Sequence, residues 1–174
     1  MVPSFDLRYM PFRKKFYIES REIASMSDED LAALHKELEI KIRGKRCPKP
    51  VERWNQVGLS DKFLATLTKN GFDKPFAIQR QTIPAIMAGR DVIGVAKTGS
   101  GKTLAFLIPM FRHILDQPRL GEGEGPIGLI MAPARELAVQ VQCLMCCCVL
   151  LCVVACVSCV SCVSVCVCFC YIVV

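Results

Sequence analysis

The chain has 174 residues, which is enough for one domain of ordinary size. It contains 22 Lys and Arg residues and 16 Asp and Glu residues, and all of them precede residue 143, so the net charge of +6 belongs to the first 142 residues. This mildly basic segment is compatible with a polyanionic partner but does not require one. The first 20 residues lack the apolar core of a secretory signal. Only one cysteine, Cys47, precedes residue 143, which is typical of a reduced intracellular protein and argues against a disulfide scaffold.

Residues 1–50 are predicted to form a helical extension that ends in a linker. Residues 1–25 lack strong periodicity and are expected to be an extended arm. Ser27 is a candidate N-cap for an amphipathic helix in which a packed or solvated role for His35 is favoured over a ligand role. The apolar stripe of this helix comprises Leu31, Leu34, Leu38 and Ile42. The sequence "RGKRCPKPVERW" then breaks the pattern, and its basic residues favour a solvated loop over a nuclear-import or RNA-binding patch.

From residue 60 onward, predicted helices alternate with predicted strands. Helices are expected from Ser60 to Asn70, from Ala77 to Ala88 and from Lys102 to about Gln117, and another begins within "ARELAVQ". The apolar segments "DVIGVA" (91–96) and "IGLIMAP" (127–133) are predicted to be buried strands, the first of them covered on both faces. This alternation predicts an α/β fold with a parallel sheet.

The stretch "AKTGSGKT" follows the first predicted strand and opens a predicted helix. Gly99 and Gly101 leave room for backbone N–H groups to surround a phosphate, and the helix N-terminus adds positive potential. Lys102 is placed for the β- and γ-phosphates of a nucleotide, and the Thr103 hydroxyl for a magnesium ion. A tight turn without a ligand is the less favoured interpretation, because the flanking strand and helix are what a phosphate loop needs. The predicted nucleotide-binding residues of this loop are Ala96, Lys97, Thr98, Gly99, Ser100, Gly101, Lys102 and Thr103.

A second candidate site feature lies upstream in "GFDKPFAIQ", residues 71–79. The carboxamide of Gln79 is able to pair with the exocyclic amine and a ring nitrogen of adenine, and Phe72 is able to stack on the base. Taken alone, Gln79 is more typical of a surface helix position and Phe72 of a core position.

These motifs together resemble those of DEAD-box ATP-dependent RNA helicases. The block at 71–79 resembles the adenine-reading Q motif of the family, with Trp54 as its upstream aromatic, and "AKTGSGKT" is similar to the family's phosphate loop. "APARELA" is similar to its RNA-backbone motif. Two residues depart from the family pattern: Ala134 stands where threonine is usual, and Phe76 stands where a small hydroxyl residue is usual. The resemblance implies that the RNA-binding residues are Pro133, Ala134, Arg135 and Glu136.

The resemblance also implies a partial RecA-like (P-loop NTPase) fold, with ATP and magnesium as cofactors and RNA as partner. Segments such as "PFRKKFYIES" and "GEGEGPIGLIMAPARELA" are similar to the subgroup that acts on pre-mRNA in early spliceosome assembly, which implies spliceosomal partners and a nuclear location. The likeness covers about residues 9–142 and stops before the family's Asp-Glu-Ala-Asp motif and second domain. We therefore expect an N-terminal extension (1–50), a first part of helicase domain 1 (51–142), and no catalysis by this chain alone.

The 32 residues from Cys143 to Val174 carry no charge and are predicted to be a separate tail. Their length fits a membrane anchor, and the spacing of Cys159 and Cys162 fits a thiol-rich metal or disulfide segment less well. A translated tract of alternating T and G, which encodes Cys and Val, is the favoured interpretation. The chain as a whole is then an incomplete helicase, a non-catalytic isoform that binds nucleotide, RNA or splicing partners, or a membrane-anchored protein.

Overall fold

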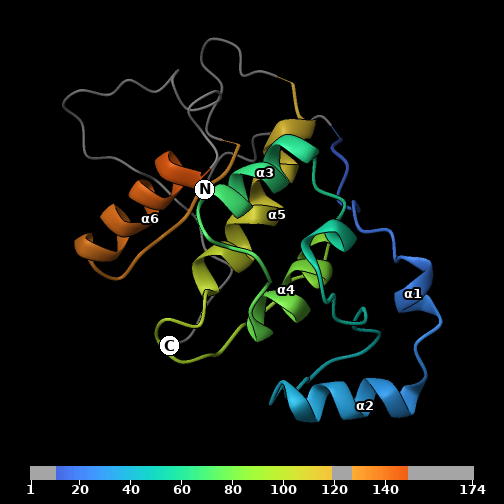
Figure 1. The fold of residues 1–174 in the computed structure, drawn as a ribbon. Coiled ribbons are helices and arrows are strands. Elements are labelled where there is room, and N and C mark those ends of the chain that lie inside the picture. The colour runs from blue at the N-terminus through green and yellow to red at the C-terminus, as the bar shows by residue number, and fades with distance from the viewer. Residues whose placement is uncertain (1–10, 119–126, 149–174) are drawn as a thin grey trace, which may run out of the picture.

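A computed structural model describes residues 11–118 and 127–148 of the chain (Figure 1). These residues form helices joined by irregular segments, and they contain no β-strand. The elements in chain order are α1 (Arg21–Ala24), α2 (Asp28–Glu37), the 3₁₀ helix η1 (Trp54–Val57), α3 (Asp61–Lys69), α4 (Ala77–Met87), α5 (Lys102–Asp116) and α6 (Arg135–Cys148).

The helices predicted from the sequence are confirmed to within a few residues. Ser27 caps α2, because its side chain accepts a hydrogen bond from the backbone N–H of Asp30. Gly71 and Gly89 follow α3 and α4 with φ of 78° each, the left-handed conformation that ends helices. One part of the prediction is wrong: α2 ends at Glu37 and buries no residue, so Ile42 lies beyond the helix.

The two predicted strands are absent from the described residues. Residues 91–97 have no regular secondary structure, and their side chains alternate between exposed and half-buried. Val92 lies against α4 and α5, whereas Ile93 and Val95 are 71% and 70% exposed. In the second segment, Ile130 takes part in a single isolated bridge. A strand requires a hydrogen-bonded neighbour, and the described residues provide none, so burial on both faces is wrong for residues 91–96.

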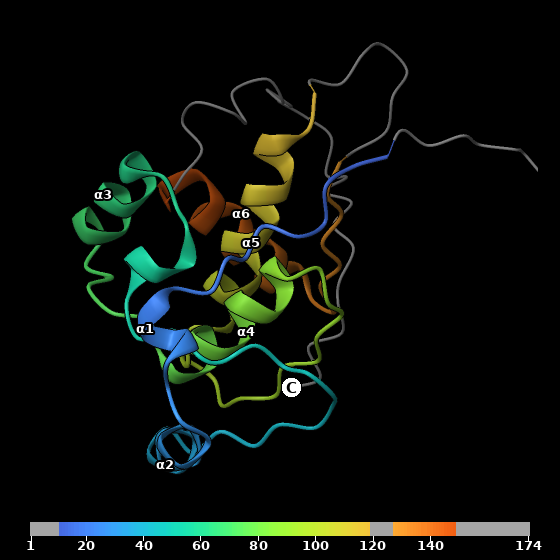
Figure 2. The same cartoon turned by 90° about the vertical axis from the view of Figure 1, so that its right-hand side faces the viewer.

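The core lies where α4 and α5 pack against each other and against α3, η1 and the arm. Fully buried side chains from α4 and α5 include Ile83, Met87, Leu107 and Ile108. α2 lies at the edge of the molecule in both views, apart from this centre (Figures 1 and 2). Its half-buried His35 pairs with Gln81, with 3.1 Å between Nε2 and Oε1, so of the two expected roles, packed or solvated, the structure shows the packed one.

The predicted arm is an ordered strap over residues 11–18, followed by the short helix α1. The strap crosses α5 and α4 in Figure 2. The backbone N–H groups of Phe16 and Tyr17 both donate to the carbonyl of Met87, at 2.7 and 3.0 Å. Burial, with Glu19 as a second cause, raises the pKa of Tyr17 to about 12. Residues 1–10 of the predicted arm lie outside the described residues. Residues 11–25 are only partly extended, because α1 occupies Arg21–Ala24.

The predicted tail begins inside a helix. α6 starts at Arg135, as the sequence predicts, and its backbone continues to Cys148, across the expected boundary at residue 142. The rest of the tail, with Cys159 and Cys162, lies outside the described residues. Within residues 11–118 and 127–148, no helix is long and apolar enough to cross a membrane.

Candidate nucleotide-binding site

The phosphate loop occupies the turn between residues 91–96 and α5. Gly99 and Gly101 have φ of 78° and 83°, and Gly101 is the residue that precedes α5. Both glycines are therefore favoured by conformation, because other residues rarely adopt such angles. Gly101 is also required by space, since a Cβ there would stand 2.4 Å from Nε2 of Gln79. The loop places the free N–H groups of the first turn of α5 beside it, as the sequence predicts.

Lys102 folds back over the loop that precedes it. Its ammonium Nζ donates to the carbonyl of Ala96 and to the carbonyl of Lys97, the latter at 2.9 Å. The cation is thus held by two backbone oxygens of the loop itself. The half-buried Thr103 follows it on α5.

Ser100 gives a direct indication that the loop suits a polar ligand. Its Oγ is buried and has no hydrogen-bond partner among the described residues. A buried hydroxyl without a partner costs about 1–3 kcal/mol, so a ligand that offers an acceptor or donor there is favoured. A phosphate oxygen fits this requirement.

Gln79 lies at the junction of the two candidate motifs. Its side chain is 0% exposed, so the alternative that it is a surface helix residue is wrong. Its Oε1 accepts from the backbone N–H of Phe76 at 2.8 Å, and its Nε2 donates to the carbonyl of Gly101 at 3.0 Å. The carboxamide therefore ties the start of α4 to the phosphate loop. The Gln79 carboxamide still has one N–H and one oxygen lone pair that could bind adenine. Because the side chain is buried, adenine could reach these groups only after they become accessible.

The aromatic residues of the upstream block have different environments. Trp54 is 6% exposed, and its Nε1–H donates to the carbonyl of Phe72 at 2.8 Å. Phe72 is half-buried and packs against the core, as its position suggests when taken alone. Through this hydrogen bond Trp54 holds the backbone of the Q-motif block, residues 71–79.

Phe76 is a site residue that the sequence marks only as a departure from the family pattern. Its ring is 52% exposed, and its Cδ2 lies 2.8 Å from the point where a Cβ on Gly101 would stand. The ring therefore covers the phosphate loop from the side of α4. The signal in the sequence was its place three residues before Gln79, which makes it the N-cap of α4.

The predicted RNA-contacting residues form a separate exposed segment. Pro133, Ala134, Arg135 and Glu136 are all exposed, and the last two begin α6. Among the described residues, no hydrogen bond or ion pair joins them to the phosphate loop, so the structure does not bring the two predicted sites together. Their exposure leaves them accessible to a large partner.

The residues present fit the phosphates of ATP better than they fit a resident metal. The described residues contain no group of three or more His, Cys, Asp or Glu side chains arranged to hold a metal ion. Thr103 would supply one oxygen to a magnesium ion that arrives with the nucleotide, which is the usual way this ion is bound at phosphates. The magnesium ion would neutralise phosphate charge when bound.

Comparison with known proteins supports this interpretation of the site. Residues 76–144 match the DEAD/DEAH box helicase family. The chain is 59% identical over 142 residues to "DEAD-box ATP-dependent RNA helicase 42" of Oryza sativa subsp. japonica, which covers 82% of this chain and 14% of that protein. It is also 59% identical over 136 residues to human "Probable ATP-dependent RNA helicase DDX46" (78% and 13% covered) and over 145 residues to the "Pre-mRNA-processing ATP-dependent RNA helicase prp5" of Aspergillus fumigatus (81% and 12%).

Two solved structures resemble the fold. The RNA helicase Prp28 from Chaetomium thermophilum bound to ADP matches with a TM-score of 0.64 and 35% identity, covering 73% of this chain and 31% of that one. The yeast DEAD-box splicing factor Prp28 matches with a TM-score of 0.64 and 34% identity, covering 69% and 28%. This likeness supports the RecA-like class, while the parallel sheet itself stays a prediction. The chain spans less than a sixth of the length of these curated relatives. It belongs to the DEAD-box helicase family, and its relatives include a pre-mRNA-processing helicase.

Proposed function

We propose that this chain supplies the adenine- and phosphate-binding part of an ATP-dependent RNA helicase that remodels RNA in pre-mRNA splicing. The observation that carries the proposal is the junction at Gly101, where Gln79, Phe76 and the phosphate loop meet. Names of the relatives support RNA as the partner, ATP as the nucleotide, and a nuclear location. Contacts to spliceosomal proteins are part of the same proposal.

In this proposal each group has a defined task. The N–H groups at the start of α5 and the ammonium of Lys102 hold the phosphates. Thr103 contributes an oxygen to magnesium. Gln79 and an aromatic ring, Phe72 by family resemblance, hold the adenine, and residues 133–136 hold RNA phosphates.

Binding is expected without turnover in a polypeptide of these 174 residues. Phosphoryl transfer also needs a carboxylate at the metal, a group that orients water, and further positive charge at the transition state. None of the residues that surround the loop, namely Phe76, Gln79 and residues 96–103, carries a carboxylate. RNA-stimulated phosphate release above the level of a Lys102→Ala control would contradict this part of the proposal.

The test is the affinity for ATP with magnesium, measured by calorimetry or with a fluorescent ATP analogue. Lys102→Ala removes a charge-assisted contact worth about 1.5–3 kcal/mol, so the affinity should fall by roughly 10- to 150-fold. Lys69→Ala removes an equal charge from the exposed end of α3 and is the matched control. Equal affinities for the two variants would show that residues 96–103 do not bind phosphate.

A further inference from the structure

Three segments that are distant in the sequence meet at the C-terminal end of α4. The strap is held there by the two hydrogen bonds to Met87, and the carbonyl of Lys14 lies 2.8 Å from the point where a Cβ on Gly89 would stand. Arg90, the next residue, donates from Nη1 to the carbonyl of Lys45 at 2.6 Å. The strap, the end of α4 and the linker at 43–49 therefore form one continuous surface.

This surface gathers positive charge without matching negative charge. Seven exposed cations belong to the three segments, and none has a carboxylate oxygen within 4.0 Å among residues 11–118 and 127–148: Arg13, Lys14, Lys15, Arg43, Lys45, Arg46 and Arg90. Residues 11–18 and 43–49 contain no acidic residue at all, and Asp91 is the nearest one in sequence to Arg90. Each segment alone would be an ordinary solvated basic loop, but together they form a patch that favours a polyanion.

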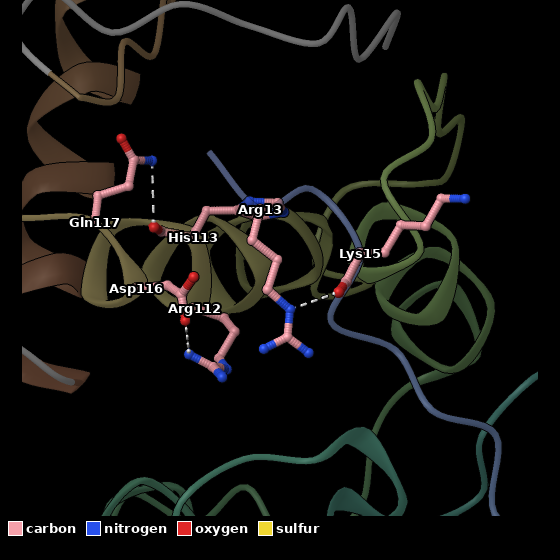
Figure 3. A network of polar contacts seen from close by, with 6 residues as sticks. All are labelled: Arg13, Lys15, Arg112, His113, Asp116 and Gln117. Atoms are coloured by element: carbon pink, nitrogen blue, oxygen red, sulfur yellow. Dashed lines mark hydrogen bonds and ion pairs between the residues drawn. The ribbon is translucent and has the colours of Figure 1, made fainter. Parts of the chain in front are cut away.

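The strap backbone is fixed, so its cations are presented in a defined place. Phe16 is 7% exposed and lies between two guanidinium groups, with Cζ of Arg13 at 4.8 Å and Cζ of Arg112 at 4.6 Å from its ring centre. The ring of His113 meets Phe16 edge-on at 4.6 Å. Figure 3 shows these α5 residues beside the strap, with Lys15 extending away from α5.

An aromatic side chain lies among the exposed cations. Phe12 is 51% exposed, and Nζ of Lys14 lies 5.3 Å from its ring centre. Exposed aromatic rings beside Lys or Arg are the means by which proteins bind single-stranded nucleic acid, because the ring stacks on a base while the cations contact phosphates.

We infer that Phe12, Lys14, Lys15, Lys45, Arg46 and Arg90, here called the strap surface, bind single-stranded RNA. The cations contact successive phosphates, and Phe12 stacks on one base. This inference rests on the proposed function only in that RNA is the partner. The strap surface is separate in sequence from the phosphate loop and from residues 133–136.

The experiment measures binding of a fluorescein-labelled oligouridylate to the full chain by anisotropy, without nucleotide and over a series of salt concentrations. The double variant Lys14→Gln/Lys15→Gln should lose roughly tenfold in affinity, and the log–log salt slope should become shallower by about 1.4, since each phosphate contact to a single strand contributes about 0.7. Phe12→Ala should lose at least about fivefold with an unchanged slope.

The matched control is Lys36→Gln/Lys69→Gln, which removes the same charge from exposed positions on α2 and α3. The control should change the affinity by less than about twofold. An equal loss in the control, an unchanged slope in Lys14→Gln/Lys15→Gln, or no RNA binding by the parent chain would each overturn the inference. If the strap surface binds an acidic protein and not RNA, the parent chain should show no binding of the oligouridylate.

Lys102→Ala separates this inference from the proposed function. That variant should lose ATP affinity and keep RNA affinity in the nucleotide-free assay. If Lys102→Ala binds ATP like the parent, the proposed nucleotide site fails and the RNA result at the strap surface still stands.

Discussion

Alanine substitutions at the two glycines of the phosphate loop measure how much the contact between Gln79 and Gly101 contributes to stability. Gly99 and Gly101 have nearly equal φ of 78° and 83°, so replacement by alanine imposes a similar backbone cost of about 1–2 kcal/mol at each position. Their surroundings differ. A Cβ at Gly99 would have no atom within 4 Å, whereas a Cβ at Gly101 would stand 2.4 Å from Nε2 of Gln79.

Gly101→Ala should therefore destabilise the protein by more than Gly99→Ala. The new methyl group displaces the Gln79 carboxamide, which breaks its hydrogen bond to the Gly101 carbonyl and leaves a buried amide without a partner. These effects should lower the free energy of unfolding of Gly101→Ala by about 1–3 kcal/mol more than that of Gly99→Ala. Unfolding in urea is followed by the fluorescence of Trp54, the single tryptophan of the chain, which is 6% exposed.

A double-variant cycle identifies the cause of the difference. In a Gln79→Ala background the displaced amide is absent, and only the exposed Phe76 ring, whose Cδ2 lies 2.8 Å from the new Cβ, still has to move. Gly101→Ala should therefore cost less free energy of unfolding in this background than in the parent. The reasoning is refuted if the two glycine variants lose the same free energy of unfolding, or if Gln79→Ala and Gly101→Ala are additive.

Three further predictions concern the contacts that surround the site. Trp54→Phe removes the hydrogen bond to Phe72 and should lower the free energy of unfolding by about 1–3 kcal/mol, measured by circular dichroism, and an unchanged value would contradict the ordering role of this bond. Gly89→Ala places a methyl group 2.8 Å from the Lys14 carbonyl and should speed tryptic cleavage within the strap, whereas Gly58→Ala, also at positive φ but with nothing within 4 Å, should not. Burial lowers the pKa of His113 below its usual value of 6.5, although hydrogen bonds to the carbonyls of Arg13 and Ile86 oppose this shift. As the pH falls, the unfolded chain therefore binds a proton at His113 before the folded chain does. The free energy of unfolding that is present above about pH 6.5 should decrease below that pH. The measurement is the decrease in Tm between about pH 7 and pH 5.5, which should be smaller in His113→Gln than in the parent protein. An equal decrease in both proteins would exclude His113 as its cause.

Helix positions were predictable from the sequence because their signals are local. Ser27 satisfies an N–H of its own helix, and Gly71 and Gly89 end helices through their own φ angles. The two strands were predictable only as apolar segments. Whether a strand forms depends on partners elsewhere in the chain, and residues 91–96 show an exposed face at Ile93 and Val95 where such partners are absent from the described residues.

The site shows the same division between local and distant causes. The phosphate loop depends on Gly99, Gly101 and the start of α5, which are neighbours in sequence, and α5 begins at Lys102 as predicted, although the described residues before the loop form no strand. The contact of Gln79 with Gly101 spans 22 residues, and no periodicity reveals it. The strap surface was missed for the same reason, since "FRKK" and "RGKR" are each ordinary basic segments until Gly89 and Arg90 bring them together.

These distant contacts meet in α4, which has one candidate site at each end. Gln79 and Phe76 join its first turn to the phosphate loop, and Met87 and Gly89 join its last turn to the strap. A helix of 11 residues with seven of them buried is unable to shift without disturbing the core, because a packed interior resists sliding. We therefore expect that any movement of the strap large enough to displace Met87 would move the whole of α4, Gln79 included, and would disturb the core. If RNA at the strap surface moves α4, the affinity for ATP should change with it, and by linkage ATP should change the affinity for RNA by the same factor.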